Sequence, residues 1–312
     1  LVTSGSIGDS TKIVISGGKI NGNVYGGGEN GFVGNVDIDV SKDMSPIEYT
    51  DTETSTGTAE GSKTTTTTWC YGLSIRDDVV TNGSTTINIS GGTIGLTDET
   101  LNTLLGTNGA EPTLSTLKEL HGNVFGGGKG ANATVTKETN VTVSSGLIYG
   151  NVYGGGDFGC VGQFTGAQGV TASLKDGYTH VDIKGGEMNG VYGGGRGYTE
   201  FNDIAKDKQE GTALTSTQLS KLIFGSVGAS YQDPGNAEST NTETVASGNT
   251  DSAKFNTNVT VTAGTINGNV YGGGELGLVS YLDVHSNYGG GRTSVIIGDD
   301  TILSNALTIK GS

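Results

Sequence analysis

One short string recurs along this 312-residue chain and constrains the fold more than any other feature of the sequence. The full string, Gly-Asn-Val-Tyr-Gly-Gly-Gly, lies at 22–28, 150–156 and 268–274. A variant with Phe in place of Tyr lies at 122–128, and a shortened form without the Asn lies at 190–195. Before each copy, Ile or Val alternates with polar residues and is followed by small residues. The unit is therefore x-[VI]-x-[VI]-x-G-G-x-I-x-G-N-V-Y-G-G-G, present five times and a fraction, and such repetition is typical of repeat architectures.

The pattern within the unit predicts short strands joined by tight corners. Alternating β-branched residues indicate strands, and the glycines that follow interrupt them. Successive glycine triplets are separated by 28 residues at closest and by 39, 79 and 100 elsewhere, so the unit is constant while its connections vary. A solenoid tolerates this variation because each rung contacts only its neighbours. We therefore expect an all-β chain that forms a parallel β-solenoid of five to six rungs, of the right-handed β-helix type.

Five segments interrupt the repeat, and we expect them to be insertions into a single solenoid domain at 1–312. The first is rich in Thr and contains Trp69, which favours a β-rich flap. Regularly spaced leucines in the second and fourth favour short helices that cover an open side of the coil. Because the first residue is not Met and the repeat continues to the last strand, we expect a segment of a longer protein. The insertions lie at about 41–84, 96–120, 162–178, 198–255 and 280–290.

Stacking of equivalent rungs predicts columns of like side chains about 4.8 Å apart. The apolar columns that begin at Ile13 and Ile20 should fill the interior of the coil. The Val before each aromatic residue should also point inward, which places the aromatic residue on the opposite, exposed face. We name these aromatic residues the aromatic column, and its members are Tyr25, Phe125, Tyr153, Tyr192 and Tyr271.

An asparagine column is expected at a corner, where stacked amides satisfy one another's donors and acceptors. The fourth repeat has no equivalent residue, because Asn189-Gly190 runs directly into Val191, so we expect a tightened corner there. The members of the asparagine column are Asn23, Asn123, Asn151 and Asn269.

The residue after each glycine triplet is charged, and its sign alternates along the chain. Alternating charges on neighbouring rungs attract, whereas like charges would repel, so this column should help to set the register. As exposed pairs, these residues should stabilise the fold by roughly a few tenths of a kcal/mol each. We name them the charged column, and its members are Glu29, Lys129, Asp157, Arg196 and Glu275.

The overall composition excludes several classes of protein. The chain has 57 Gly and 3 Pro without a G-X-Y period, which rules out collagen. It has 17 Lys+Arg against 32 Asp+Glu, and the net charge of -15 disfavours nucleic acid and anionic membranes as partners. No stretch is apolar enough to predict a membrane span. A zinc site is not expected, because the chain has only two cysteines, Cys70 and Cys160, and three dispersed histidines. No cofactor is therefore predicted, although calcium bound by loop carboxylates is an alternative.

A polysaccharide-degrading enzyme is the main alternative to a structural protein. Such an enzyme needs acids that converge on one outer face. Asp37 and Asp39 share a strand face, but Asp182 is alone in its column and His180 occupies a position expected to be solvated. No catalytic residue is therefore predicted. A glycan-binding module that uses Trp69 and the tyrosines without turnover is a third possibility.

The G-x-I-x-G-N-V-Y-G-G-G unit resembles repeats in very large surface or secreted proteins of host-associated anaerobic bacteria, and its general layout is similar to β-helical adhesins. The resemblance covers the repeats, roughly half of the chain, and not the insertions. It implies an extracellular or cell-surface stalk, adhesin or filament subunit, and it carries over no catalytic residue. The expected partners are further copies of the chain or adjacent repeats end to end, and a host or microbial glycan or protein.

Overall fold

The computed structural model describes the parts of the chain that contain the repeats. Almost all of these residues lie in or beside β-strands, most of which pair in parallel, so the expected all-β class is confirmed. The described residues are 6–34, 47–52, 64–69, 82–97, 100, 122–130, 133–165, 173–197, 225–228, 255–279, 281–283, 288–289, 291–298 and 307–311.

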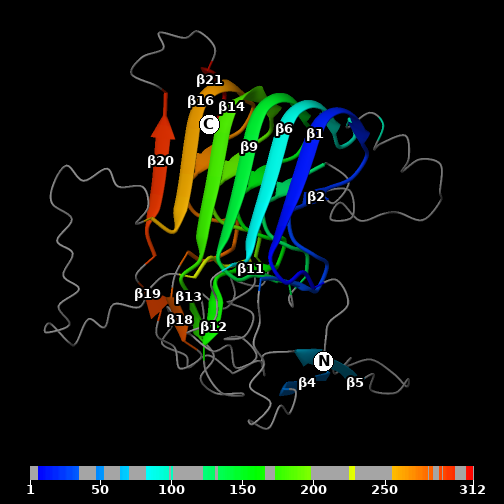
Figure 1. Cartoon of the computed structure of the whole chain (residues 1–312), viewed down its shortest axis with the longest axis vertical. Coiled ribbons are helices and arrows are strands. Elements are labelled where there is room, and N and C mark those ends of the chain that lie inside the picture. Colours follow the sequence, from blue (N-terminus) through cyan, green and yellow to red (C-terminus); the bar gives the residue numbers. More distant parts are fainter. Residues whose placement is uncertain are drawn as a thin grey trace, which may run out of the picture.

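The largest sheet collects one long strand from every repeat. Its order is β1-β6-β9-β14-β16-β20, which is also the order along the chain, and β21 pairs with the second part of β16. All of these pairs are parallel, and Figure 1 shows the strands side by side from blue to red. We call this the long-strand sheet. Its strands are β1 (Ser10–Ile20), β6 (Ser84–Ile94), β9 (Glu138–Ile148), β14 (Tyr178–Met188), β16 (Thr257–Ile266), β20 (Thr293–Ile297) and β21 (Leu307–Ile309).

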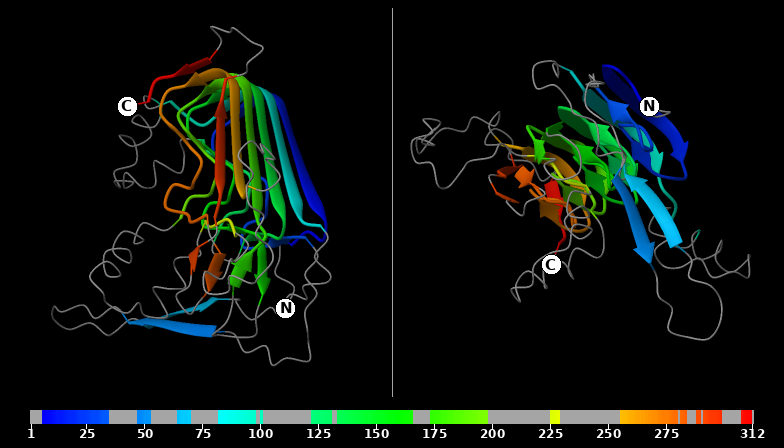
Figure 2. Two further views of the ribbon diagram at one scale, coloured as in Figure 1. Left: turned by 90° about the vertical axis from the view of Figure 1, so that its left-hand side faces the viewer. Right: turned by 90° about the horizontal axis from the view of Figure 1, so that it is seen from below.

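Two smaller parallel sheets follow the same order of repeats. The second sheet has the order β17-β15-β10-β7-β2, and each of its strands is the Val-aromatic pair of one repeat. The third sheet has the order β11-β8-β3 and is extended by single bridges at Ile7, Val227 and Val279. Viewed along the stack in the left panel of Figure 2, the long strands lie one behind another and the chain returns on the opposite side. The short strands are β2 (Val24–Tyr25), β7 (Val124–Phe125), β10 (Val152–Tyr153), β15 (Val191–Tyr192), β17 (Val270–Tyr271), β3 (Phe32–Val33), β8 (Thr134–Val135) and β11 (Cys160–Val161).

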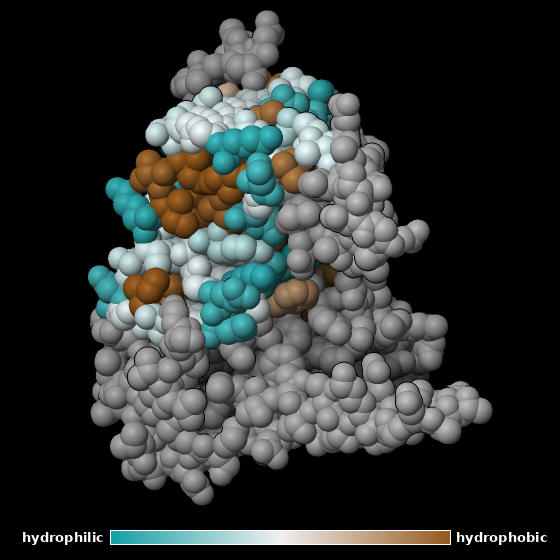
Figure 3. Space-filling model, turned by 90° about the vertical axis from the view of Figure 1, so that its right-hand side faces the viewer, coloured by the Kyte–Doolittle hydropathy of each residue, from teal (hydrophilic) through white to brown (hydrophobic). Residues whose placement is uncertain are grey.

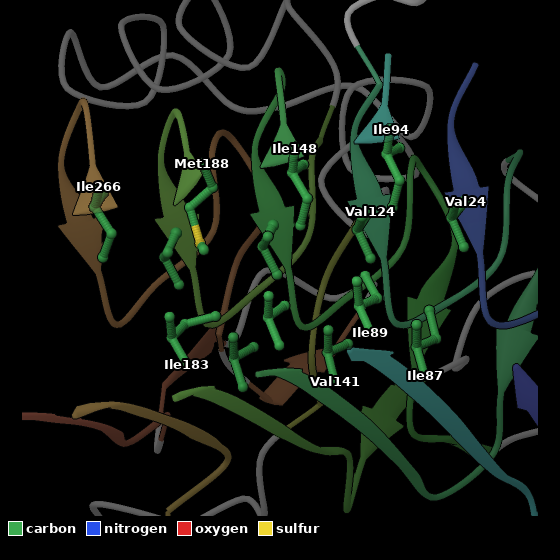
Figure 4. Packing of buried hydrophobic residues seen from close by; sticks show 14 of the residues in the cluster. Val24, Ile87, Ile89, Ile94, Val124, Val141, Ile148, Ile183, Met188 and Ile266 are labelled. Carbon is green, nitrogen blue, oxygen red and sulfur yellow. The ribbon is translucent and has the colours of Figure 1, made fainter. Parts of the chain in front are cut away.

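The main hydrophobic core lies between the long-strand sheet and the second sheet. Pairing places Ile94 opposite Ile148, and Met188 opposite both Ile148 and Ile266, so the expected apolar columns are confirmed. Figure 4 shows Ile94, Ile148, Met188 and Ile266 in one row, with Val124 and Val24 from the second sheet beside them. One chain thus builds a continuous core from Ile, Val and a single Met, all less than 2% exposed in the middle repeats.

A second core, formed by the third sheet, was not part of the predicted repeat. Val33, Val135, Val161 and Val227 are completely buried and pack together, with Val279 against them. In the first, third and fourth repeats the sequence signal is Gly-x-Val-Gly after the glycine triplet, as in Gly31-Phe32-Val33-Gly34, whereas the second repeat has Ala133-Thr134-Val135-Thr136. The fourth repeat carries this signal at 225–228, so these residues belong to the stack and not to the predicted insertion at 198–255.

A threonine closes each repeat and is buried in all but the first, and the predicted unit missed this residue as well. Thr11 Oγ1 donates a hydrogen bond to the carbonyl oxygen of Gly26 in the same repeat at 2.6 Å. The long strands from β1 to β20 each have Thr two residues before their first Val or Ile, which is a readable signal. The equivalent threonines pair with the first glycine of the triplet in each repeat: Thr85 with Gly126, Thr139 with Gly154, Thr179 with Gly193 and Thr257 with Gly272.

The glycine triplets are needed for close backbone contact between repeats. A Cβ atom on Gly154 would lie 2.2 Å from the carbonyl oxygen of Gly193, and one on Gly155 would lie 2.6 Å from the backbone nitrogen of Gly195. The triplet glycines do not have positive φ, in contrast to Gly18 in the bend of β1, where φ is 84°. The triplet positions therefore have no room for a side chain, whereas Gly18 in the bend is needed because its backbone has a left-handed conformation.

The strands in the described parts of the insertions pair antiparallel. In the first, β4 (Ile47–Thr52) pairs antiparallel with β5 (Thr64–Trp69). The third and fifth insertions contribute to one antiparallel sheet of β12 (Gln163–Thr165), β13 (Ser173–Lys175), β18 (Tyr281–Asp283) and β19 (Tyr288–Gly289). The leucine-rich stretches for which helices are predicted lie outside the described residues.

Candidate functional site: the aromatic and charged columns

The aromatic column is a continuous stack of parallel rings. Each short strand of the second sheet holds one ring, because β-pairing places Val opposite Val and aromatic residue opposite aromatic residue. Neighbouring ring centroids are 4.6 to 5.3 Å apart, and the ring planes differ by 4° to 17°. Stacked pairs of this kind contribute about 0.5–1.5 kcal/mol each beyond their burial.

The middle of the aromatic column is buried, contrary to the expected exposed face. Phe125 is 0% and Tyr153 is 1% exposed, and exposure reaches 43% at Tyr271, the last ring of the stack. Each ring covers the faces of its neighbours, so a ligand could stack on an open ring face only at an end of the column. The column as a whole is therefore part of the packing and not an extended contact surface.

The asparagine column joins each repeat to the next through the backbone. Asn23 Oδ1 accepts the backbone N–H of Asn123 at 2.7 Å, and Asn123 Oδ1 accepts that of Asn151 at 2.8 Å. In the fourth repeat Asn189 Nδ2 donates to Asn151 Oδ1 at 2.7 Å, so Asn189 continues the column from one position earlier. Two residues separate β14 from β15, against three between β9 and β10, which confirms the tightened corner.

The asparagine amides also orient the tyrosine hydroxyls. Asn151 Nδ2 donates to Tyr153 Oη at 3.0 Å, and Asn23 and Asn269 do the same to Tyr25 and Tyr271 at 2.9 Å. A hydroxyl that accepts from the amide keeps its proton available for another acceptor. For Tyr25 and Tyr153, this second acceptor is a carboxylate of the charged column.

Charged residues contact the aromatic ring two repeats earlier. Tyr25 Oη in the first repeat donates to Asp157 Oδ2 in the third at 3.2 Å. Tyr153 Oη in the third repeat donates to Glu275 in the fifth. Phe125 in the second repeat has no hydroxyl, and its ring lies 5.2 Å from Cζ of Arg196 in the fourth. Each acid thus faces a tyrosine, and the guanidinium faces a phenylalanine, which suits a cation–π contact.

The charged column forms two separate ion pairs. Arg196 makes a bidentate contact with Asp157, with Nε 2.9 Å from Oδ1 and Nη2 2.8 Å from Oδ2. Asp157 is 1% exposed, so this pair is buried and the expectation of exposed, weak pairs is wrong here. Lys129 and Glu29 pair at 3.4 Å and are both largely exposed, as expected. Glu29 and Lys129 have no aromatic ring two repeats earlier, and they remain at the surface.

Burial shifts the ionisation of Tyr25, Tyr153 and Tyr192 in the aromatic column. It raises the pKa of Tyr25 and of Tyr192 to about 12, and the negative charges of Asp157 and Glu275, respectively, add to the shift. The pKa of Tyr153 is raised well above its ordinary value, first by burial and then by the charge of Glu275. These hydroxyls therefore keep their protons to a higher pH in the folded chain than in the unfolded one.

We expect the folded chain to lose stability in alkali. An unfolded tyrosine has a pKa of about 10, so between pH 10 and about 12 the unfolded state releases protons that the folded state holds. The contribution of each raised tyrosine pKa to the free energy of unfolding is fully present below pH 10. It falls as pH rises towards the folded pKa, by about 1.4 kcal/mol per pH unit for each tyrosine. Urea unfolding at pH 8, 10 and 11.5 measures this slope, and absorbance of tyrosinate at 295 nm reports ionisation. A free energy of unfolding that is level between pH 10 and 11.5 would contradict the assignment.

Some candidate residues are not brought to this site. Asp37, Asp39, Cys70 and the side chain of Trp69 lie outside the described residues. Cys160 is buried in β11, which raises the pKa of its thiol to about 12. Asp182 forms an ion pair with Lys184 of its own strand at 2.7 Å. Within the described ranges, no three His, Cys, Asp or Glu side chains form a group that could hold a metal ion.

A comparison with protein-family models, with curated proteins and with solved structures finds no match to this chain. In the part of the chain that the structure describes, no helix has the length and apolar character needed to cross a membrane.

Proposed function

We propose that the chain is a parallel β-solenoid of the right-handed β-helix type, in which the three sheets are successive faces of one coil. The order of the strands supports this proposal. The third repeat passes from β9 in the long-strand sheet to β10 in the second sheet and β11 in the third, and then to β14 beside β9. Connections between parallel strands of one sheet have a strong preference for the right-handed sense, which supports the hand.

We propose further that this coil is an extracellular structural or adhesive element without catalysis, such as a cell-surface stalk, an adhesin or a filament subunit. One observation carries the proposal: the polar groups that recur in the repeat are engaged by other repeats. Asp157 is held by Arg196 and Tyr25, and Tyr153 by Glu275. Groups used in this way fix one repeat on the next, which is what a stiff support requires.

The insertions are the proposed contact regions for a host or microbial glycan or protein. They leave the stack at connections between its strands, so they can vary without disturbing the register of the columns. The low content of charged residues and the net charge of -15 also fit an exported protein that does not bind nucleic acid.

Labelling of the producing cells tests this function. Antibodies raised against the purified chain should label the surface of intact cells, and a brief protease treatment of those cells should remove the signal. Cells opened by detergent serve as the control for total protein. A signal that appears only after the cells are opened would contradict an extracellular role.

A polysaccharide screen tests the absence of catalysis. The purified chain should release no new reducing ends from a panel of plant, host and bacterial polysaccharides. Turnover that is lost in Asp37→Asn or Asp39→Asn would replace the structural proposal with an enzyme. Binding without turnover that is lost in Trp69→Ala would narrow the proposal to a glycan-binding module.

A further inference from the structure

The two ends of the long-strand sheet share a feature that its middle lacks. Pairing links one outward column through the six strands from β1 to β20, and its inner four members are polar: Asn88, Thr142, Asp182 and Thr260. The terminal members are Val14, which lies opposite Asn88, and Ile296, which lies opposite Thr260. Val14 is 61% and Ile296 is 51% exposed. Apolar residues therefore replace polar ones in this column at both ends of the stack.

The core columns are also open at both ends. Val295 and Ile297 continue the buried columns of β16 but are 40% and 54% exposed, because none of the described strands pairs with the far side of β20. At the other end Ile13 and Ile20 of β1 are only partly buried. Figure 3 shows apolar side chains gathered on the face at the β1 end. Exposed apolar patches of this kind mark interaction surfaces.

The two ends are complementary in backbone direction and register. Within the described strands, β1 and β20 are the terminal strands of one parallel sheet, so each has an edge of unpaired N–H and C=O groups. A translation along the stack places β20 of one copy beside β1 of another in the same direction as every internal pair. The internal register then sets Val295 opposite Ile13, Ile296 opposite Val14 and Ile297 opposite Ile15.

The remaining contacts in this register are also compatible. In the third sheet, Ile7 at one end is 39% exposed and would meet Val279, the last member of the second core. Lys12 of β1 would face Ser294 of β20, so no like charges meet there. The second sheet ends one repeat earlier, at β17, and would not take part.

We propose that the edge formed by β20 and β21 docks on the β1 edge of a second copy of this chain, in the parallel register that joins its own repeats. The proposal rests on the scaffold function and names its partner. The contact is head-to-tail, so it does not close on itself and leads to chains of copies. Val14 and Ile296, exposed in the monomer, become neighbours in the joint.

Two edge variants and their mixture test the docking. Sedimentation velocity and light scattering of the wild-type chain over a concentration series should give integral multiples of the monomer mass. Val14→Lys blocks the β1 edge and Ile296→Lys blocks the β20 edge, so each alone should need at least a tenfold higher concentration to associate. Mixed in equal amounts, they should form a dimer and nothing larger, because one free edge of each kind remains.

Thr142→Lys is the matched control, because it adds the same charge to the same outward column in an inner repeat. It should assemble as the wild type does. A wild-type chain that stays monomeric at all concentrations, or Val14→Lys that assembles normally, would overturn the docking. If the wild-type chain stays monomeric and binds an apolar dye at the β1 end, and Val14→Lys loses the dye, this face binds another partner. That result would also overturn the docking of two copies. Surface labelling of the cells is independent of these results, so failure of the docking and failure of the scaffold function are distinguishable.

Discussion

Gly155→Ala should lower the free energy of unfolding by about 3 kcal/mol or more, because the new methyl group meets the backbone of the next repeat. Its Cβ would lie 2.6 Å from the nitrogen and 2.7 Å from the Cα of Gly195. Gly155 is held between two repeats: its N–H donates to Gly194 and its carbonyl oxygen accepts from Gly127, both at 3.0 Å. Relief of the clash would stretch these hydrogen bonds in a buried part of the stack. The shift of the urea midpoint, followed by circular dichroism, measures the loss.

Gly273→Ala is the matched control for this variant. Gly273 is also the second glycine of its triplet, but it lies in the fifth repeat, and a Cβ there would meet nothing within 4 Å. Neither glycine has a positive φ, so conformational strain does not distinguish them. We expect Gly273→Ala to change the free energy of unfolding by less than about 1 kcal/mol. Equal losses in the two variants would show that the triplet is needed for its conformation and not for the contact between repeats.

The sequence predicted those parts of the fold in which one residue type recurs at one position. The apolar columns, the stacked aromatic rings and the tight corner at Asn189 all follow from the rule that equivalent residues lie side by side in a parallel stack. The third sheet was missed because its Gly-x-Val-Gly signal is short, is absent from the second and fifth repeats, and is displaced by an insertion in the fourth. The threonine that closes each repeat was missed although it recurs in the long strands from β1 to β20, because Thr is also common elsewhere in this chain.

The arrangement of the candidate site could not be predicted in the same way. Nearest-neighbour stacking predicts contacts between adjacent repeats, whereas Tyr153 contacts Glu275 two repeats away. The charged residue lies four positions after the aromatic ring of its own repeat, on the far side of the glycine triplet. The backbone path through the triplet decides which ring it contacts, and a pattern of side chains does not report this path.

Arg196→Ala should destabilise the chain by about 3–5 kcal/mol, because it leaves a buried carboxylate without its partner. Asp157 is 1% exposed and receives both guanidinium hydrogen bonds from Arg196. The same change removes the cation–π contact with Phe125. Lys129→Ala breaks the equivalent pair of the first two repeats, where both side chains are exposed, and should cost less than about 1 kcal/mol. Urea unfolding of both variants at pH 7 gives the comparison.

A double variant separates the unpaired charge from the loss of packing. Arg196→Gln combined with Asp157→Asn removes both charges and keeps an amide oxygen that can accept from Tyr25 in place of the carboxylate. If the uncompensated charge of Asp157 causes most of the loss, the double variant should be more stable than Arg196→Ala by about 1–3 kcal/mol. Single variants at both positions complete the cycle and give the coupling energy of the pair. A double variant whose loss equals the sum of the single losses would mean that the two side chains stabilise the stack independently, and that the buried pair does not join the third repeat to the fourth.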